Sequence, residues 1–372
     1  MRHEDVIVIG AGIVGAACAH ELACAGLSVR VVDARLGSAT DAGMGHLVVI
    51  DDSATELALT RTSLGVWRDS APQLNTSCGF TNCGTLWLAA NDAEMLIAKA
   101  KWLRLQADGL NCELLDAASL ARAEPALHGD LAGALRVPGD SVVYAPSAAR
   151  WLMSASSRPI AFEQAEVVRV DDSGVLLRDG TRRESGAVVL AGGIHVTRLC
   201  PELPIRPKKG HLAITDSYPC SVHPQLVEMG YIANAHQSDG TSVAFNIQPR
   251  PTGQLLIGSS RQFDTTDPRV EPAILARMLR HALRFMLGLV NFNAIRAWTG
   301  FRAATPDSLP IIGPHPYRKG LWLAVGHEGL STTTAPGTAR LLTAQLTGGA
   351  LPFDAAPFAA KRLQRPREVP AC

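Results

Sequence analysis

Residues 5–33 read DVIVIGAGIVGAACAHELACAGLSVRVVD. The apolar run 6–9 predicts a short buried strand, the stretch that follows the glycines predicts a helix to about Ala25, and 28–32 predict a second strand. Three glycines with the spacing GxGxxG separate the first strand from the helix, and Asp33 ends the second strand. This order and length are typical of a βαβ unit that binds a dinucleotide.

Each glycine of this turn has a physical role in such a unit. Gly10 permits the tight turn, Gly12 lets a pyrophosphate approach the backbone, and Gly15 lets the helix and the strand pack closely. The helix N-terminus adds partial positive charge, and Asp33 would accept hydrogen bonds from the adenosine ribose. The alternative is a glycine-rich turn without a ligand. A nicotinamide and a flavin dinucleotide fit this unit equally well, so the rest of the chain has to distinguish them.

The composition excludes several classes of protein. The 372 residues suffice for two or three domains, and 35 basic against 34 acidic residues give a net charge of +1 without a block of like charge. We therefore expect neither nucleic acid nor an anionic membrane surface as a partner. No run of about 18 apolar residues is present to span a membrane. We expect a cytoplasmic protein, with peripheral attachment to the inner face of a membrane as the alternative.

The eight cysteines are scattered along the chain, which fits a reducing compartment. Cys78 and Cys83 are close enough in sequence to be a redox pair or two iron-sulfur ligands. Neither a second pair nor a nearby histidine cluster completes such a site, so two packed thiols are the favoured interpretation. We predict no metal.

Further strands and glycine loops follow this unit. Residues 162–170 and 186–193 read as strands, and 321–330 read as a strand that runs into a glycine loop. The hydroxyls of 331–334 predict the N-cap of a last helix over about 336–346. Between these regions, 92–107 predict a helix, and 211–215, 242–248 and 254–259 predict strands separated by turns such as Pro251-Thr252-Gly253. A helix is expected from about Pro272 to Leu289, and a surface extension after Ala355.

These motifs together resemble the FAD-dependent amine oxidoreductases of the D-amino-acid oxidase type, the family of glycine oxidase and sarcosine oxidase. The resemblance rests on GAGIVG with Asp33, on DAGMGH at 41–46, on VLAGG at 189–193, on GFR at 300–302 with TPD at 305–307, and on GHEGL at 326–330. It implies an α/β fold in which a Rossmann-like FAD domain carries a second, substrate domain on a mostly antiparallel sheet. The implied FAD segments are 1–80, 141–210 and 300–372, and the implied substrate segments are 81–140 and 211–299.

The resemblance also implies which residues hold the cofactor. No cysteine lies between Cys220 and Cys372 where some relatives tether the flavin, so we expect FAD to be non-covalent. For Met44, simple packing is the alternative. The residues expected to bind FAD are Gly10, Ala11, Gly12, Ile13, Val14, Gly15, Asp33, Ala34, Arg35, Ala42, Gly43, Met44, Val167, Ala191, Gly192, Gly300, Gly326, Gly329, Leu330, Ser331 and Thr332.

The implied reaction passes a hydride from the substrate Cα to flavin N5 and leaves an imine. Arg302 is the expected carboxylate anchor, because a guanidinium offers two parallel donors to two carboxylate oxygens. An ion pair of Arg302 with Asp307 or another acid, with a purely structural role, is the alternative. Glu328 is expected to reach the substrate ammonium, and His327 and His46 are further candidates for the active site. For His327, a packed loop histidine is the equally weighted alternative.

The acceptor of the electrons is inferred from a missing residue. Sarcosine-type oxidases use a lysine near the flavin to help oxygen react, and no lysine lies between Lys209 and Lys319. We therefore favour a dehydrogenase that passes electrons to a partner subunit or a quinone, and segments 45–49 and 326–330 look most like the flavin subunit of D-hydroxyproline dehydrogenase. A glycine- or sarcosine-type oxidase that makes hydrogen peroxide and a non-catalytic FAD subunit that relays electrons are the alternatives.

Overall fold

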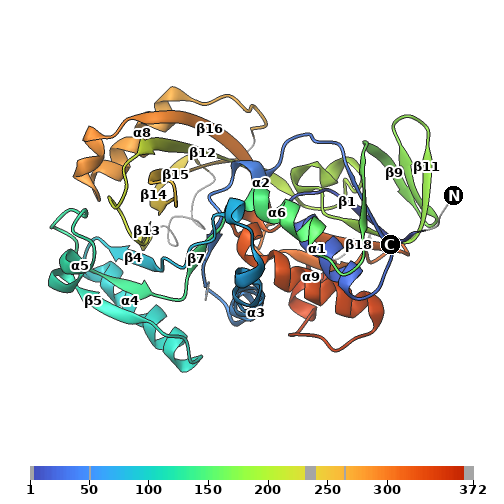
Figure 1. Cartoon of the computed structure of the whole chain (residues 1–372), viewed down its shortest axis with the longest axis horizontal. Helices are drawn as coiled ribbons and strands as arrows, with labels where there is room; N and C mark the ends of the chain where they lie inside the picture. Colours follow the sequence, from blue (N-terminus) through green and yellow to red (C-terminus); the bar gives the residue numbers. More distant parts are fainter. Residues whose placement is uncertain (1–3, 50–51, 231–239, 264, 364–372) are drawn as a thin grey trace, which may run out of the picture.

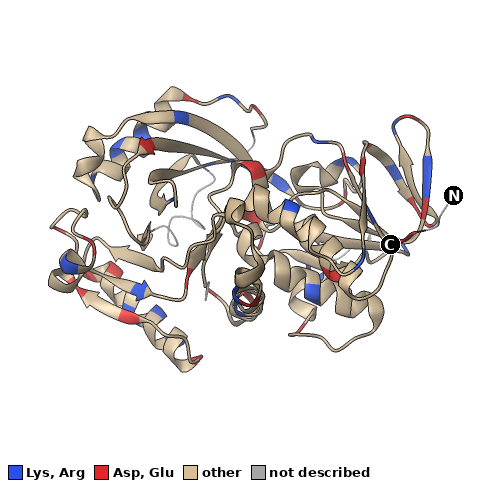
Figure 2. Ribbon diagram, in the orientation of Figure 1, with Lys and Arg blue, Asp and Glu red and all other residues tan. Residues whose placement is uncertain are grey.

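Two lobes, each built on one large sheet, make up the computed structural model (Figure 1). The structure describes residues 4–49, 52–230, 240–263 and 265–363. Basic and acidic residues are interspersed along the ribbon of both lobes (Figure 2). In the described part of the chain, none of the helices is both long enough and apolar enough to cross a membrane.

The first lobe begins with the predicted βαβ unit. Strand β1 (Glu4–Ile9) lies parallel to β2 (Val29–Asp33), and helix α1 (Ile13–Cys24) connects them. Val8 and Val31 pair in the register of the two strands, and both are fully buried because the parallel sheet is covered on both faces. The unit therefore has the order of elements that its sequence predicts.

Six more strands complete this sheet. Its main path runs β17-β18-β11-β1-β2-β8, and β10 pairs with both β11 and β9. The strand-rich stretch 162–170 is divided between two strands. The bounds are β8 (Ile160–Gln164), β9 (Val167–Asp171), β10 (Gly174–Leu177), β11 (Arg182–Leu190), β17 (Ile311–Pro314) and β18 (Leu321–Val325).

The second lobe is a mostly antiparallel sheet, as predicted. Its order is β16-β12-β15-β14-β13-β4-β6-β5, and the β13–β4 pair is parallel. Residues 251–253 form the turn between two of its strands, with the amide of Arg250 donating to the carbonyl of Gln254. The bounds are β4 (Thr85–Ala89), β5 (Glu113–Asp116), β6 (Gly133–Val137), β12 (Arg206–Ser217), β13 (Gln225–Glu228), β14 (Ser242–Pro249), β15 (Gln254–Phe263) and β16 (Ala294–Ala304).

Helices cover the two sheets. Helix α4 covers exactly the residues predicted for it, whereas α8 ends at Leu283 and is followed by a 3-10 turn, Leu287–Asn291, so the helix expected to Leu289 is shorter. The two-residue strands β3 (His46–Leu47) and β7 (Ser141–Val142) pair between the lobes. The bounds of the remaining helices are α2 (Ala39–Ala42), α3 (Ala54–Ser70), α4 (Asp92–Ala107), α5 (Ala117–Ala123), α6 (Ala145–Ser154) and α8 (Pro272–Leu283).

The last helix, α9 (Ser331–Thr347), begins five residues before the predicted start. Its hydroxyls do not cap it, because Thr333 donates to the carbonyl of His46 and Thr334 donates to the carbonyl of Leu330. Pro336 lies inside the helix, in its first turns, and has no backbone N–H to donate. The next residue, Gly337, packs against Ser63 of α3. The N-terminus of α9 is thereby carried toward the space between the lobes.

The segment after Ala355 is not a simple surface extension. Phe358 is fully buried against the first lobe, and Arg362 forms an ion pair with Asp307 at 2.7 Å. Pro366 and Pro370, which the sequence places in the same tail, lie outside the described residues.

Candidate active site

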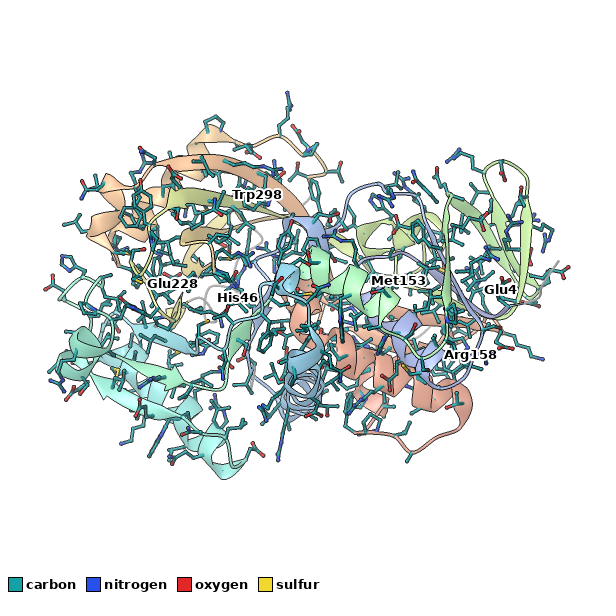
Figure 3. The ribbon with its side chains drawn as sticks, in the orientation of Figure 1. Glu4, His46, Met153, Arg158, Glu228 and Trp298 are labelled. Atoms are coloured by element: carbon teal, nitrogen blue, oxygen red, sulfur yellow. The ribbon has the colours of Figure 1, made fainter. Side chains whose placement is uncertain are left out.

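A cavity between the lobes brings together most of the residues expected around a flavin ring. Its walls come from the 39–46 segment, from β12, β14, β15 and β16, and from the start of α9. Figure 3 shows His46 in this region between the two sheets. The lining residues are Ala39, Ala42, Gly43, Met44, Gly45, His46, Gly210, Leu212, Asn246, Ser259, Gly300, Phe301, Arg302, Glu328, Gly329, Ser331 and Thr332.

The glycine turn lies away from this cavity, at the start of α1. Gly10 has a φ of +106°, and a Cβ there would lie 2.6 Å from the carbonyl oxygen of Ala191, so only glycine fits. A Cβ on Gly15 would lie 1.9 Å from the carbonyl oxygen of Gly10, which explains the close approach of helix and strand. Gly12 is the N-cap of α1 and offers no capping side chain. The open helix end suits an anion such as a diphosphate.

Asp33 holds the shape of this turn. One carboxylate oxygen accepts from the amide of Ala11 at 2.6 Å, and the other accepts from the amide of Arg35 at 2.5 Å. Arg35 itself stacks over the ring of Phe162. Ala191 and Gly192 lie against Gly10, and Val167 begins β9 shortly after the backbone contact between Ala165 and Asp33. The contacts of Asp33 and Ala191 thus fix the shape of the turn at the open end of α1.

The 39–46 segment lies against the second lobe. Gly45 has a φ of +81°, and a Cβ there would lie 1.8 Å from the carbonyl oxygen of Val143. The missing side chain of Gly300 accommodates Ala42, whose Cβ would lie 2.3 Å from a Cβ at that position. Trp298, in the same strand as Gly300, donates to the carbonyl of Ala42 at 3.2 Å. The segment is therefore fixed along one wall of the cavity.

His46 is held as a neutral ring. Gln225 donates to the carbonyl of Ser141 at 3.0 Å, which turns its Oε1 toward His46 Nδ1, so that Nδ1 carries the proton. Burial lowers the pKa of His46 to about 4, although the bond to Gln225 favours the charged form. At neutral pH the ring offers Nε2 as an acceptor and is not a proton donor from an imidazolium.

Arg302 lines the cavity from β16. Its Nη1 donates to the carbonyl of Ser260 at 3.1 Å, and a Cβ on Gly210 would lie 2.6 Å from Nη1, so the glycine makes room for the guanidinium. Among the described residues, Arg302 has no ion-pair partner, because Asp307 is paired with Arg362. The structural alternative of an Arg302–Asp307 pair is thereby wrong.

Glu328 lines the cavity but is already engaged. Lys208 Nζ lies 2.5 Å from Glu328 Oε1, and the lysine is almost fully buried over the ring of Phe263. Burial by itself would raise the pKa of Glu328, but Lys208, Arg261 and Arg302 outweigh it and hold the pKa below its ordinary value. Lys208, two residues before the lysine-free stretch 210–318, thus places an ammonium next to Glu328 at the cavity wall. The lack of a lysine in that stretch therefore does not leave the cavity without a nearby ammonium.

His327 does not line the cavity. Its Nε2 lies 3.0 Å from Thr338 Oγ1, the side chain is buried, and burial lowers its pKa to about 3. This geometry favours the packed loop histidine over a proton-transfer role. Gly326 has a φ of +81° and packs against Thr305, and Leu330 is the N-cap of α9. These two residues position the loop whose next residues, Gly329, Ser331 and Thr332, reach the cavity.

Sequence reasoning missed Lys208, Gly210, Asn246 and Ser259. Each belongs to a strand whose local pattern gives no functional signal, and only the pairing of β12, β14 and β15 brings them beside Arg302. The one available hint was Asn246, a polar residue between Phe245 and Ile247 in an apolar strand.

The cysteine pair is two separate thiols. Cys78 and Cys83 are both free, Cys78 is fully buried, and burial raises the pKa of both. These properties favour packed, unreactive thiols.

The described residues contain one group with metal-ligand chemistry, formed by Cys200, Glu202 and His315. The Nδ1 of His315 accepts from the amides of Tyr317 and Arg318, so the proton is on Nε2, which faces Glu202. The Arg318 guanidinium also lies 3.0 Å from Cys200 Sγ. A protonated Nε2 and a neighbouring cation both oppose binding of a metal ion.

Comparison with known proteins agrees with this geometry. Glycine oxidase of Geobacillus kaustophilus is 29% identical over 97% of this chain and 98% of its own. Hydrogen cyanide synthase subunit HcnC of Pseudomonas aeruginosa is 26% identical over 98% of this chain and 97% of its own. The crystal structure of glycine oxidase from Geobacillus kaustophilus superposes with a TM-score of 0.87, at 25% identity, and covers 98% of this chain and 100% of that one.

The sequence profile of one family, described as DAO, FAD dependent oxidoreductase, matches residues 5–345. The match includes the glycine turn, both sheets and nearly all of α9. The chain therefore belongs to the DAO family of FAD-dependent oxidoreductases.

Proposed function

We propose that the protein is an FAD-dependent dehydrogenase that oxidises the Cα–N bond of a small amino or imino acid to an imine. The observation that carries this proposal is the Arg302 guanidinium, which lines the cavity and has no acidic partner among the described residues. A half-buried guanidinium without an acidic partner binds a carboxylate well, because two of its N–H groups match the two carboxylate oxygens. In a non-catalytic FAD subunit that only relays electrons, Arg302 would have no substrate carboxylate to bind.

FAD is proposed to bind without a covalent bond. The turn Gly10–Gly15 with Asp33 would hold the diphosphate and adenosine, and the 42–46 segment with the N-terminus of α9 would hold the ring system. When bound, the flavin would supply the acceptor for the hydride that leaves the substrate Cα. Among the described residues that line the cavity, none is a cysteine that would tether it.

The residues of the chain would orient the substrate rather than exchange protons with it. Arg302 would fix the carboxylate, and neutral His46, which also lines the cavity, would offer an acceptor. Glu328, paired with Lys208, would keep one negative charge near the site without extending freely to the substrate ammonium. No strong base would then remove the proton of the substrate amine. The fraction of bound substrate with a deprotonated amine would therefore rise with pH.

The substrate proposed is a D-hydroxyproline or a related cyclic or N-substituted amino acid. The apolar side chains of Met44, Leu212 and Phe301 line the cavity and would contact a small hydrocarbon ring. The similarity to glycine oxidase supports small amino acids as the wider class.

A dehydrogenase is proposed because the Lys208 ammonium is neutralised by Glu328 at 2.5 Å, which leaves it little net charge to offer a developing superoxide. Electrons would pass to a partner subunit or a quinone, and similarity to a protein named as a subunit supports the first of these. A second candidate, an oxidase that makes hydrogen peroxide, is favoured by the similarity to glycine oxidase and by the presence of Lys208 near the cavity.

Anaerobic titration of the holoprotein with the D- and L-forms of proline, hydroxyproline and alanine, and with the achiral sarcosine and glycine, tests the proposal. Bleaching of the flavin absorption by one of them identifies the substrate and shows catalysis, and failure of all of them to bleach it contradicts the proposal. Mixing the reduced protein with oxygenated buffer in a stopped-flow instrument then separates the two candidates. Reoxidation much slower than reduction supports the dehydrogenase, and reoxidation at the turnover rate with stoichiometric peroxide supports the oxidase.

A further inference from the structure

One buried acceptor in the cavity has no partner. Asn246 of β14 is 4% exposed and lines the cavity, and its Oδ1 makes no hydrogen bond within the described part of the chain. Its neighbours Phe245 and Ile247 point into the core of the second lobe, so Asn246 projects from the opposite face of the strand, toward the cavity. A buried amide oxygen without a partner is costly, and such an atom in a binding cavity indicates a ligand that donates to it.

The local contacts of Asn246 among the described residues provide no hydrogen-bond donor for its Oδ1 atom. The Nδ2 group lies 3.5 Å from Ser259 Oγ, at the outer limit of a hydrogen bond. The Oδ1 atom lies over Gly258, where a Cβ would be 2.7 Å away, so the glycine leaves room for the amide. The amide is therefore packed in place while its acceptor stays available.

Asn246 and Arg302 lie over the same strand, β15. Asn246 is opposite Gly258 in the strand register, and the Arg302 guanidinium reaches across Gly210 to the carbonyl of Ser260. Two residues along a strand separate these points by about 7 Å. An α-amino acid that forms one hydrogen bond through its carboxylate and another through its amine spans roughly 8 Å between the protein atoms. The spacing fits a ligand that bridges the two residues.

We propose that Asn246 determines specificity by accepting a hydrogen bond from the amine N–H of the substrate through Oδ1. This inference rests on the proposed function and adds to it the group that recognises the nitrogen. Arg302 alone would bind any small carboxylate, whereas Arg302 with Asn246 selects carboxylates with an N–H on the adjacent carbon. A ligand without that donor leaves Oδ1 desolvated and unpaired, which discriminates against it by about ten- to a hundred-fold.

Two aromatic carboxylates of nearly the same shape test the proposal. Pyrrole-2-carboxylate has a ring N–H beside its carboxylate, and furan-2-carboxylate has a ring oxygen there. We measure the Kd of each for the FAD-loaded protein from the change in the flavin absorption spectrum. The wild-type protein is expected to bind the pyrrole at least about ten-fold more tightly. In Asn246→Leu that ratio is expected to fall to about one, through weaker binding of the pyrrole.

Two further variants separate recognition from folding. Asn246→Asp keeps an oxygen acceptor and is expected to keep the preference for the pyrrole. Gln262→Leu removes another buried amide oxygen without a partner, in the neighbouring strand and outside the cavity lining, and is expected to leave the ratio at its wild-type value.

The outcomes are distinct. Equal Kd values for the two ligands in the wild-type protein, or an unchanged ratio in Asn246→Leu with normal FAD content, overturn the role of Asn246 and leave the proposed function standing. If neither carboxylate binds and no amino acid bleaches the flavin, the proposed function itself has failed. A ratio lost in both Asn246→Leu and Gln262→Leu also overturns the specific role, because it reports a general disturbance of the sheet.

Discussion

Lys208 Nζ lies 2.5 Å from Glu328 Oε1, and this ion pair joins the second sheet to the loop that precedes α9. Lys208 pairs with Arg302 in the register of β12 and β16, so the two cations and the carboxylate belong to one electrostatic group. The adjacent Lys209 points to the other face of β12 and pairs with Glu271 at 2.8 Å. Two neighbouring lysines with different surroundings therefore allow a controlled experiment.

Lys208→Met is expected to raise the pKa of Glu328, because burial then acts with less opposition from positive charge. A carboxylate inhibitor should then bind with a pH dependence that the wild-type protein lacks near neutral pH, measured from the flavin spectrum between pH 5 and pH 8. Under the dehydrogenase proposal, reoxidation by oxygen stays slow in this variant. Lys209→Met is the matched control and should leave the binding profile unchanged. If the wild-type protein reoxidises quickly and only Lys208→Met makes reoxidation slow, then Lys208 promotes the reaction with oxygen.

Arg302→Ala is expected to weaken the binding of carboxylate ligands by about 2 kcal/mol or more, roughly thirty-fold in Kd, because a desolvated charge-assisted pair is lost. Gly210→Ala should act in the same direction by displacing the guanidinium, since the new Cβ would lie 2.6 Å from Nη1. Both variants should retain FAD.

Arg362→Ala provides the comparison, because that arginine pairs with Asp307 away from the cavity lining. It should alter stability without altering the Kd of the ligand. Unchanged ligand affinity in both Arg302→Ala and Gly210→Ala would assign the guanidinium to structure alone.

Gly12→Val is expected to abolish retention of FAD, because a side chain at the open end of α1 would occupy the space of the diphosphate and would also press on Thr40. FAD content is read from the ratio of absorbance at the flavin maximum to that at 280 nm after gel filtration. Gly65→Ala, in α3 where no atom lies within 4 Å of an added Cβ, is the control and should retain the cofactor. Acid precipitation of the wild-type protein should leave FAD in the supernatant, and a yellow pellet would contradict non-covalent binding.

His327→Gln tests the buried loop histidine through stability. The pKa of His327 is about 3 when folded and about 6.5 when unfolded, so between these values the unfolded chain binds the extra proton and the folded state loses stability as the pH falls. From pH 7.5 to pH 5 the wild-type protein should lose about 2 kcal/mol more than the variant in its free energy of unfolding, measured with urea. Glutamine keeps a hydrogen-bonding group for Thr338. Parallel pH profiles of the two proteins would show that His327 is not buried as a neutral ring.

The amino-acid sequence by itself determined the local elements whose causes are local. The strand, glycine turn and helix of residues 4–33 follow from an apolar run, three glycines and a second apolar run, and the bounds of α4 follow from its own periodicity and its N-cap Asn91. The turn at 251–253 likewise depends on its own proline and glycine. The start of α9 was missed because its threonine hydroxyls bind the carbonyls of His46 and Leu330 instead of capping the helix.

Only the tertiary structure decided the composition of the site. Lys208 and Arg302 are 94 residues apart in sequence and become neighbours through the pairing of β12 with β16, and Asn246 joins them through β15. A search for a lysine within one stretch of sequence could not find Lys208, and the polar Asn246 between Phe245 and Ile247 gave a hint without showing which residues it would join. Strand pairing brings together side chains from distant segments, and hydrogen bonds and charges act over a few ångströms of space rather than along the chain, so the chemistry of this cavity is defined only once the sheet has formed.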